Sequence, residues 1–430
     1  MRPTRDLALR GRTVNGAKRL AALAAITAIG GVTAAVRPPG PHRVFPNDPL
    51  FRNQLSFYYE GGTTSLIVRS ATGERRQVTL APGVSLDLPA AWAITTGSRS
   101  VVVAVLDDGF FYAHEDLAAN VWRNPGETGT DSAGLDKAGN GRDDDGNGYV
   151  DDVVGYDFAF DDPDPDAYVL DGMDATRIQP YRHSDPVLGI IGAAGNNHTG
   201  VAGINWRVSL MLLKTGAQGV PRSQVDTMRP LRAARAIRYA VDNGARVINW
   251  SGFSSDTSAA RREELHRAVR YAAERGVLVV VGAGNSGVDI DEDANCVSPQ
   301  CFDEPNVMRV AELKFDGALV RYQAGDRWRG SNYGVRRVEV AAVGQNFTTE
   351  VQDGRSTYGL FGGTSGAAPV VSGVAALMLS VDSSLRAADL RRLIMETATK
   401  LPALSGKVAS RGVVNAYRAV LAARDRRRAR

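Results

Sequence analysis

The stretch that decides the fold is SVVVAVLDDG, residues 100–109. Its β-branched residues form an uninterrupted apolar run, which is typical of a strand buried on both faces of a parallel sheet. The run ends at Asp107 and Asp108, followed by a glycine. In open α/β sheets the chemistry lies at the carboxyl ends of the strands, so Asp107 is a candidate functional residue.

Strands and helices alternate along the chain after this strand. Further strands are predicted at residues 208–214, 246–251, 277–285 and 338–344. Helices are predicted at residues 186–195, 229–245, 261–276, 366–380 and 387–398. Strands that alternate with helices of this length indicate βαβ units, and therefore an α/β fold with a doubly wound, mostly parallel sheet flanked by helices.

The composition is that of a folded globular protein. The chain has 430 residues, of which 43% are hydrophobic and 23% charged. The net charge of +4 comes from the two ends, because residues 1–20 and 424–430 hold an excess of arginine and the interior is mildly acidic. A nucleic-acid partner is not expected, since that function needs basic residues clustered on a folded face. Residues 424–430 are interpreted as a solvated basic tail.

The first 36 residues have the pattern of a secretory signal. A basic segment precedes the apolar run Leu20–Val36, and small residues near Ala34 suit cleavage. The alternative is an uncleaved membrane anchor, for which the run is short. We therefore expect a secreted protein without stable membrane association. Residues 37–99 are interpreted as an N-terminal extension or short pro-region, and residues 100–423 as the main domain.

Two cysteines occur in the chain, Cys296 and Cys301, within CVSPQC. The intervening residues with Pro299 can form a turn that closes a small loop. An exported protein would tolerate such a disulfide, and two thiols alone make a poor metal site. A disulfide between them is predicted.

Three more polar residues lie at the ends of predicted elements. Ser365 lies in GGTSGAAP, residues 362–369, at the start of a helix. Glycines there allow close approach of a substrate, and a helix N-terminus favours negative charge. His183 lies at the entrance of a helix and Asn285 follows a strand. Each of these residues taken alone is more often structural than functional.

Together the four residues indicate a reaction. Asp107 in VAVLDDG, His183 in HSDPVLGIIGA, Asn285 in VVVGAGNSG and Ser365 in GGTSGAAPVVSGVAAL resemble the motif blocks of the subtilisin-like serine peptidases, in the family's order. The resemblance covers about residues 85–420. It implies a subtilisin-like fold and a secreted, bacterial-type endopeptidase acting on proteins or peptides through an acyl-enzyme. Asp107, His183 and Ser365 would form the catalytic triad, and Asn285 would bind the oxyanion.

The same resemblance implies a substrate channel with two walls. These wall residues are Ser251, Gly252, Phe253, Gly282, Ala283 and Gly284. The sequence departs from the family pattern beside the triad, where Asp108 and Asp185 are expected to raise the pKa of His183. These departures leave open a second function, a catalytically silent binding protein on the same fold. A monomer is expected in either case.

Residues 120–182 form a long insertion rich in Asp and Gly. Within DDDGNGYVDD, residues 143–152, oxygen-bearing side chains alternate as Asp143, Asp145 and Asn147. That spacing with a following glycine is how a loop wraps Ca²⁺, and Asp151 or Asp152 would supply the remaining carboxylate. Similar insertions in secreted bacterial members of the family support a structural Ca²⁺ site. The alternative is a solvated acidic turn.

Other functions are less consistent with the sequence. GAGNSG, residues 282–287, matches a dinucleotide-binding fingerprint, but no helical pattern follows it. An α/β-hydrolase would need its histidine after the nucleophile, and the last histidine, His266, precedes Ser365.

Overall fold

The computed structural model describes residues 41–59, 64–69, 75–166, 183–216, 222–325, 327–352 and 354–430. Within it, His42–Arg430 forms one compact unit. The predicted signal, residues 1–36, lies outside the described residues.

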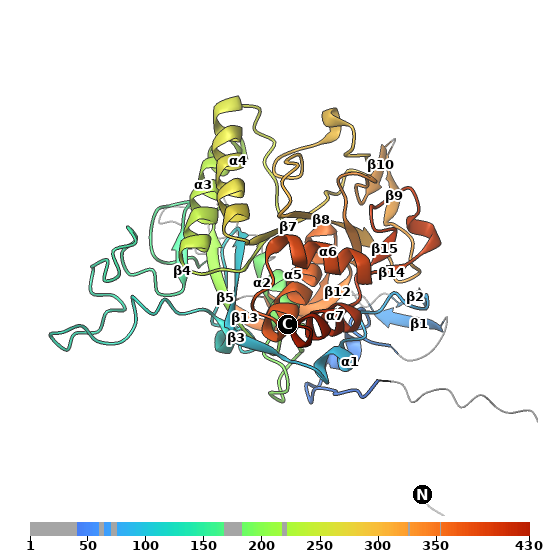
Figure 1. Cartoon of the computed structure of the whole chain (residues 1–430), viewed down its shortest axis with the longest axis horizontal. Helices are drawn as coiled ribbons and strands as arrows, with labels where there is room; N and C mark the ends of the chain where they lie inside the picture. Colours follow the sequence, from blue (N-terminus) through green and yellow to red (C-terminus); the bar gives the residue numbers. More distant parts are fainter. Residues whose placement is uncertain are drawn as a thin grey trace, which may run out of the picture. The chain divides into compact units, whose positions relative to one another are not determined.

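A nine-stranded sheet carries this unit (Figure 1). Its strand order is β14-β15-β11-β8-β7-β6-β3-β5-β4, and every pair is parallel except β14 with β15. The predicted α/β fold with a mostly parallel sheet is confirmed. The strands are β3 (Gly97–Asp107), β4 (Gly155–Asp157), β5 (Arg207–Lys214), β6 (Val247–Trp250), β7 (Leu278–Gly282), β8 (Val307–Leu313), β11 (Val340–Val343), β14 (Thr399–Lys400) and β15 (Gly412–Val413).

The position of β3 explains why the chemistry gathers at its end. The chain pairs β5 with one edge of β3 and then β6 with the other. This reversal of direction is a topological switch point, where the loops after neighbouring strands diverge and leave a crevice. Asp107 is the last residue of β3 and therefore lies at that crevice.

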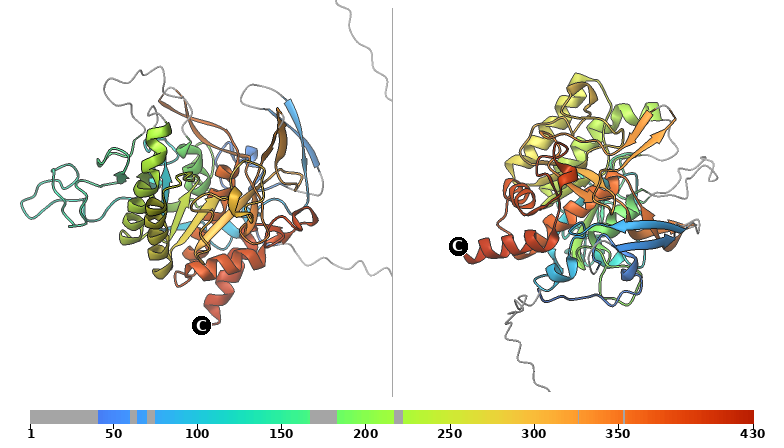
Figure 2. Two further views of the ribbon diagram at one scale, coloured as in Figure 1. Left: turned by 90° about the horizontal axis from the view of Figure 1, so that it is seen from above. Right: turned by 90° about the vertical axis from the view of Figure 1, so that its right-hand side faces the viewer.

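The apolar run of β3 faces two helix layers. Val103 and Val105 belong to a core with helices α2 and α5, whereas Ala104 and Leu106 belong to a core with α3 and α4. Successive strand side chains point to opposite faces, so a strand covered on both faces needs the continuous apolar run seen in the sequence. Figure 2 shows the two helix groups on opposite faces of the sheet. The helices are α1 (Leu88–Trp92), α2 (Ser184–Gly192), α3 (Arg222–Asp242), α4 (Ala259–Glu274), α5 (Thr364–Val381), α6 (Ala387–Thr397) and α7 (Ala416–Arg428).

Three antiparallel hairpins lie outside the main sheet. The third hairpin leads directly into α5. Their strands are β1 (Thr64–Arg69) with β2 (Arg75–Leu80), β9 (Arg321–Ala324) with β10 (Arg327–Gly330), and β12 (Asn346–Gln352) with β13 (Arg355–Phe361). Short 3₁₀ helices occur at Phe51–Asn53, Ala118–Asn120, Asp293–Asn295 and Pro402–Leu404.

The arginines at the C-terminus are part of a helix. Helix α7 continues to Arg428, and Arg426 forms ion pairs with Asp382 (3.0 Å) and Asp389 (3.1 Å).

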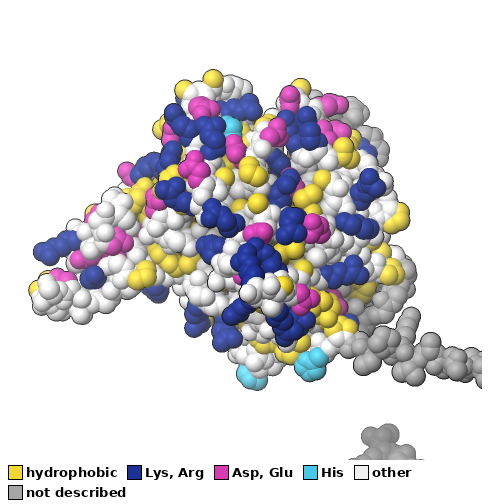
Figure 3. All heavy atoms as spheres, in the orientation of Figure 1, with side chains coloured by type: hydrophobic (Ala, Val, Ile, Leu, Met, Phe, Trp, Pro, Cys, Tyr) yellow, Lys and Arg dark blue, Asp and Glu magenta, His cyan; other side chains and the backbone are white. Residues whose placement is uncertain are grey.

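Figure 3 shows Lys and Arg side chains spread over one face of the molecule with Asp and Glu between them. Among the described residues, α5 alone is long and apolar enough to cross a membrane, and 89% of that segment is buried inside the protein, as in a core helix.

Candidate active site

A cleft of about 230 Å³ opens at the carboxyl ends of β3, β6 and β7. Asp107, His183, Asn285 and Ser365 all line it, although they are far apart in the sequence. The structure therefore brings together the four residues that the sequence singled out.

The aspartate and the histidine are hydrogen-bonded. Nδ1 of His183, the residue before α2, lies 2.9 Å from Oδ1 and 3.0 Å from Oδ2 of Asp107. An ionised carboxylate only accepts, so Nδ1 carries the proton and Nε2 is left with a lone pair. The pair thus holds the imidazole in the tautomer that a general base requires.

The charges around His183 set its pKa. Burial lowers the pKa, but the carboxylate of Asp107 and then that of Asp108 raise it, and Arg229 lowers it; the net result is a raised pKa. Arg229 also pairs with Asp108 at 3.5 Å. The prediction for Asp108 therefore agrees with this arrangement. Asp185 instead accepts the N–H of Phe111 at 2.8 Å in a fully buried position.

Ser365 is the second residue of α5, which follows the turn at Gly363. Gly363 has φ of 85°, a conformation that side-chain-bearing residues rarely adopt. The hydroxyl of Ser365 donates to the carbonyl of Ser251 (3.3 Å), and among the described residues no hydrogen bond joins it to His183. Bonds between a nucleophile and its base are often long before substrate binds.

A proline fixes the start of this helix against one cleft wall. Pro369 has no N–H, so the carbonyl four residues earlier, that of Ser365, lacks its helical partner. The hydroxyl of Ser251 donates to that carbonyl at 3.0 Å. Ser251 and Ser365 are therefore joined by two hydrogen bonds, in each of which one residue's hydroxyl donates to the other's carbonyl.

Asn285 lines the cleft, and its amide oxygen is bound to the turn before Ser365. Its Oδ1 accepts from the backbone N–H of Thr364 (2.9 Å) and from the hydroxyl of Thr364 (3.1 Å). A backbone N–H can only donate, which fixes the amide orientation and leaves Nδ2 on the other side. Together with the N–H of Ser365, one of the first-turn amides that a helix leaves unpaired, it can stabilise a developing oxyanion.

The predicted walls line the cleft, with one exception. Ser251, Gly252, Phe253, Gly282 and Gly284 belong to the lining, while Ala283 is buried in the core. Gln300, which sequence reasoning missed, joins the two walls. Its Nε2 donates to the carbonyl of Gly282 (2.8 Å) and to that of Gly252 (3.4 Å).

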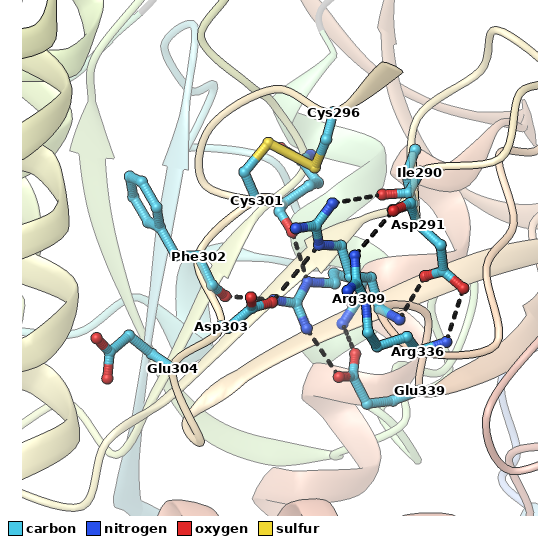
Figure 4. A network of polar contacts seen from close by, with 12 residues as sticks. Ile290, Asp291, Cys296, Cys301, Phe302, Asp303, Glu304, Arg309, Arg336 and Glu339 are labelled. Atoms are coloured by element: carbon cyan, nitrogen blue, oxygen red, sulfur yellow. Dashed lines mark hydrogen bonds and ion pairs between the residues drawn. A yellow bond between two sulfur atoms is a disulfide. The ribbon is translucent and has the colours of Figure 1, made fainter. Parts of the chain in front are cut away.

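A buried ionic network fixes the loop that carries Gln300 (Figure 4). The predicted disulfide between Cys296 and Cys301 closes this loop and is confirmed. Arg309, 3% exposed, donates Nε to the carbonyl of Gln300 (2.8 Å) and pairs with fully buried Glu339 at 2.8 Å. The loop, and through Gln300 both walls, is thereby anchored to the sheet.

The acidic insertion contains a carboxylate cluster. Oxygens of Glu127, Asp143 and Asp145 lie within 4.8 Å of one another. Glu127 is fully buried, and its Oε2 has no hydrogen-bond partner among the described residues. Burial raises the pKa of Glu127. The sequence pattern contained two of these residues and missed Glu127, which lies outside the DDDGNGYVDD motif.

The other residues predicted for this site make different contacts. Asp151 accepts the N–H groups of Gly139 (3.1 Å) and Gly141 (3.0 Å). Asp152 is fully buried, and Asn147 donates to it at 2.9 Å. These two carboxylates therefore hold the loop by hydrogen bonds.

Known proteins match this chain over most of its length. The model of the Subtilase family matches residues 98–417. A thermophilic serine proteinase of Bacillus sp. (strain AK1) is 31% identical over 332 residues, covering 77% of this chain and 64% of that protein. An extracellular protease of Xanthomonas campestris is 31% identical over 350 residues, covering 79% of this chain and 54% of that protein. The chain thus spans between about half and two thirds of these relatives.

One solved structure shows the same architecture at higher coverage. A protease from Pseudoalteromonas arctica aligns with a TM-score of 0.59 at 26% identity, covering 88% of this chain and 99% of that one.

Proposed function

The chain belongs to the subtilase family, and from this premise we propose that it is a serine endopeptidase cleaving proteins or peptides through an acyl-enzyme. The observation that carries the proposal is the bond between His183 Nδ1 and Asp107 at the cleft that Ser365 lines. A serine hydroxyl is a weak nucleophile until an oriented base takes its proton, and this pair is such a base.

In the proposed acylation, His183 acts first as general base and then as general acid. Nε2 of His183 takes the proton of Ser365 as Oγ attacks the substrate carbonyl carbon. The oxyanion accepts from Asn285 Nδ2 and the N–H of Ser365, each such donor being worth about 3 kcal/mol in the transition state. His183 then gives its proton to the leaving amine, and water repeats the sequence to release the acyl group.

We also propose that the protein is secreted. The relative from Xanthomonas campestris is named an extracellular protease, and residues 1–36 have the pattern of a signal. In the same proposal, residues 37–99 are an extension or pro-region of a monomeric enzyme. The disulfide between Cys296 and Cys301 is consistent with an oxidising compartment.

The proposal is tested by hydrolysis of casein, with His183→Ala as the inactive control. We expect the purified chain to release acid-soluble peptides and the variant to release almost none. A folded chain that leaves casein and a broad peptide library intact would favour the silent binding protein instead.

The activity of the proposed enzyme should depend on two charges beside His183. Catalysis needs the neutral imidazole, so a lower pKa of His183 moves the acid limb of kcat/KM to lower pH. Asp108 raises this pKa and Arg229 lowers it. Asp108→Asn should therefore shift the limb downward, and Arg229→Gln upward, in a pH titration of kcat/KM. Shifts of the same sign in both variants would contradict this assignment.

We propose a structural Ca²⁺ site at the carboxylates of Glu127, Asp143 and Asp145. Hard oxygen ligands suit this cation, and the buried Oε2 of Glu127 has no hydrogen-bond partner among the described residues. The bound cation would neutralise three carboxylates that otherwise repel one another. It would hold the insertion against the domain and take no part in peptide cleavage.

Removing Ca²⁺ should destabilise the protein. Binding stabilises the folded state by about 2.7 kcal/mol at a hundredfold excess over Kd, so EDTA should lower Tm and millimolar Ca²⁺ should restore it, with Mg²⁺ less effective. The sensitivity of Tm to EDTA should disappear in the Asp143→Ala, Asp145→Ala double variant. It should persist in Asp144→Asn, because the native Asp144 carboxylate accepts from Asn140. Equal EDTA sensitivity in all three proteins would place any Ca²⁺ elsewhere.

A further inference from the structure

Glu312 is a buried carboxylic acid beside the nucleophile's turn that the proposed triad does not use. It lies in β8 and is 4% exposed. Its Oε1 accepts the backbone N–H of Gly363 at 2.9 Å. Gly363 is the residue from which α5 begins, two positions before Ser365. A carboxylate thus contacts the backbone that presents the nucleophile.

The amides at this turn are divided among three functions. Glu312 accepts the N–H of Gly363, and Oδ1 of Asn285 accepts the N–H of Thr364. The next amide, that of Ser365, is the one that the proposed mechanism needs for the oxyanion. The two acceptors therefore fix the peptide planes that lead to the reacting amide.

The surroundings hold Glu312 in this position. Its own N–H donates to the hydroxyl of Ser331 at 2.8 Å. A Cβ on Gly344 would lie 2.4 Å from Cγ and 2.6 Å from Oε1 of Glu312, so a glycine is required for the carboxyl to fit. The side chain reaches Gly363 through a space that only a residue without a side chain leaves open.

We propose that Glu312 is a positioning residue, whose carboxylate holds the Gly363 N–H and so sets the turn that aims Ser365 into the cleft. The assignment rests on the proposed function of Ser365 as nucleophile. Glu312 touches no reacting atom and acts through the backbone of the turn.

The ionisation of Glu312 gives this role a measurable signature. Burial raises the pKa of Glu312 to about 7, and the bond from Gly363 opposes that shift. Among the described residues, no charged side chain on the strands and turn packed against Glu312 contributes to the shift of its pKa. A charge-assisted bond is about twice as strong as a neutral one, so protonation weakens the hold on Gly363.

The experiment measures kcat and KM against pH for the full chain on a peptide substrate. Four proteins are compared: wild type, Glu312→Gln, Glu312→Leu and the control Glu350→Gln. Burial also raises the pKa of Glu350, but this residue lies in β12. Active sites are titrated with a fluorophosphonate, so that kcat refers to folded, reactive enzyme.

We expect a graded loss in kcat with little change in KM. Glu312→Gln keeps a neutral acceptor and should lose about 3- to 10-fold, whereas Glu312→Leu leaves the N–H unpaired and should lose about 10- to 100-fold. On the acid limb, wild type and Glu350→Gln should lose about a further 3- to 10-fold beyond the loss that protonation of His183 causes, because a protonated Glu312 holds the Gly363 N–H about as weakly as a glutamine does. Glu312→Gln should show the loss from His183 alone.

The pH dependence of stability tests separately whether burial raises the pKa of Glu312, as the acid limb of activity requires. A carboxyl whose folded pKa lies above its unfolded value binds more protons when folded, so stability is lost as pH rises from about 4.5 to about 7. Glu312→Gln should therefore gain stability relative to wild type on going from acid to alkaline pH, while it loses activity. This readout remains if Glu312→Leu does not fold.

Two outcomes separate the possible failures. If wild type cleaves the substrate but Glu312→Gln has unchanged kcat and the same acid limb, the positioning role is overturned and the peptidase proposal stands. If folded wild type neither cleaves nor reacts with the fluorophosphonate, both are overturned.

Discussion

A Ser365→Ala variant should lose about 10⁵- to 10⁶-fold in kcat, because without the nucleophile only substrate binding and the oxyanion donors remain. Stability should barely change, since the lost group makes one bond of 3.3 Å to the carbonyl of Ser251. The measurement is hydrolysis of a peptide substrate, with thermal unfolding recorded on the same samples.

Ser380→Ala is the matched control for this variant. Ser380 lies in the same helix and donates to the carbonyl of Leu377 at 2.7 Å, away from the cleft. It should keep kcat within about 2-fold, because the half-buried hydroxyl of Ser380 bonds to Leu377 and Thr95 outside the cleft lining and such a substitution has a small effect on the fold. Ser365→Ala with near wild-type kcat would show that another group performs the attack.

Of the variants proposed for this protein, Glu339→Leu should show the largest loss in the free energy of unfolding. Glu339 is fully buried and accepts from Arg309 and from Arg391, each at 2.8 Å. Glu339→Leu leaves the buried guanidinium of Arg309 without its carboxylate partner, which typically costs about 3–5 kcal/mol in the free energy of unfolding. Denaturant titration measures this loss.

A double variant distinguishes the cost of an unpaired buried charge from the cost of poor packing. Arg309→Met together with Glu339→Leu removes both charges, and such replacements are often neutral. We expect it to be more stable than Glu339→Leu alone. Glu396→Ala breaks the exposed pair with Arg392 and should cost less than about 1 kcal/mol. A double variant no more stable than the single one would place the cost in packing.

The elements with continuous apolar runs could be predicted from the sequence. Strand β3 and helix α5 were found because burial on both sides demands continuous apolar runs. Strand β8 was missed because Arg309 and Glu312 interrupt its apolar run, although both are buried and bonded to groups distant in the sequence, Glu339 and Gly363. Local patterns do not contain such partners.

The candidate site divides in the same way. Asp107, His183, Asn285 and Ser365 were identified from local motifs, and the structure places them at one cleft. Glu127 and Gln300 had no such signal, since their roles depend on loops that fold back onto a carboxylate cluster and onto two walls. A glutamate or glutamine outside a motif gives no local indication of these contacts.

The most direct test of the central claim is reaction with a fluorophosphonate followed by peptide mass spectrometry. This reagent modifies a serine whose proton an adjacent base removes. We predict stoichiometric modification at Ser365, abolished in His183→Ala and retained in Ser380→Ala. A folded wild-type chain that stays unmodified, or that is modified at a different serine, would contradict the account.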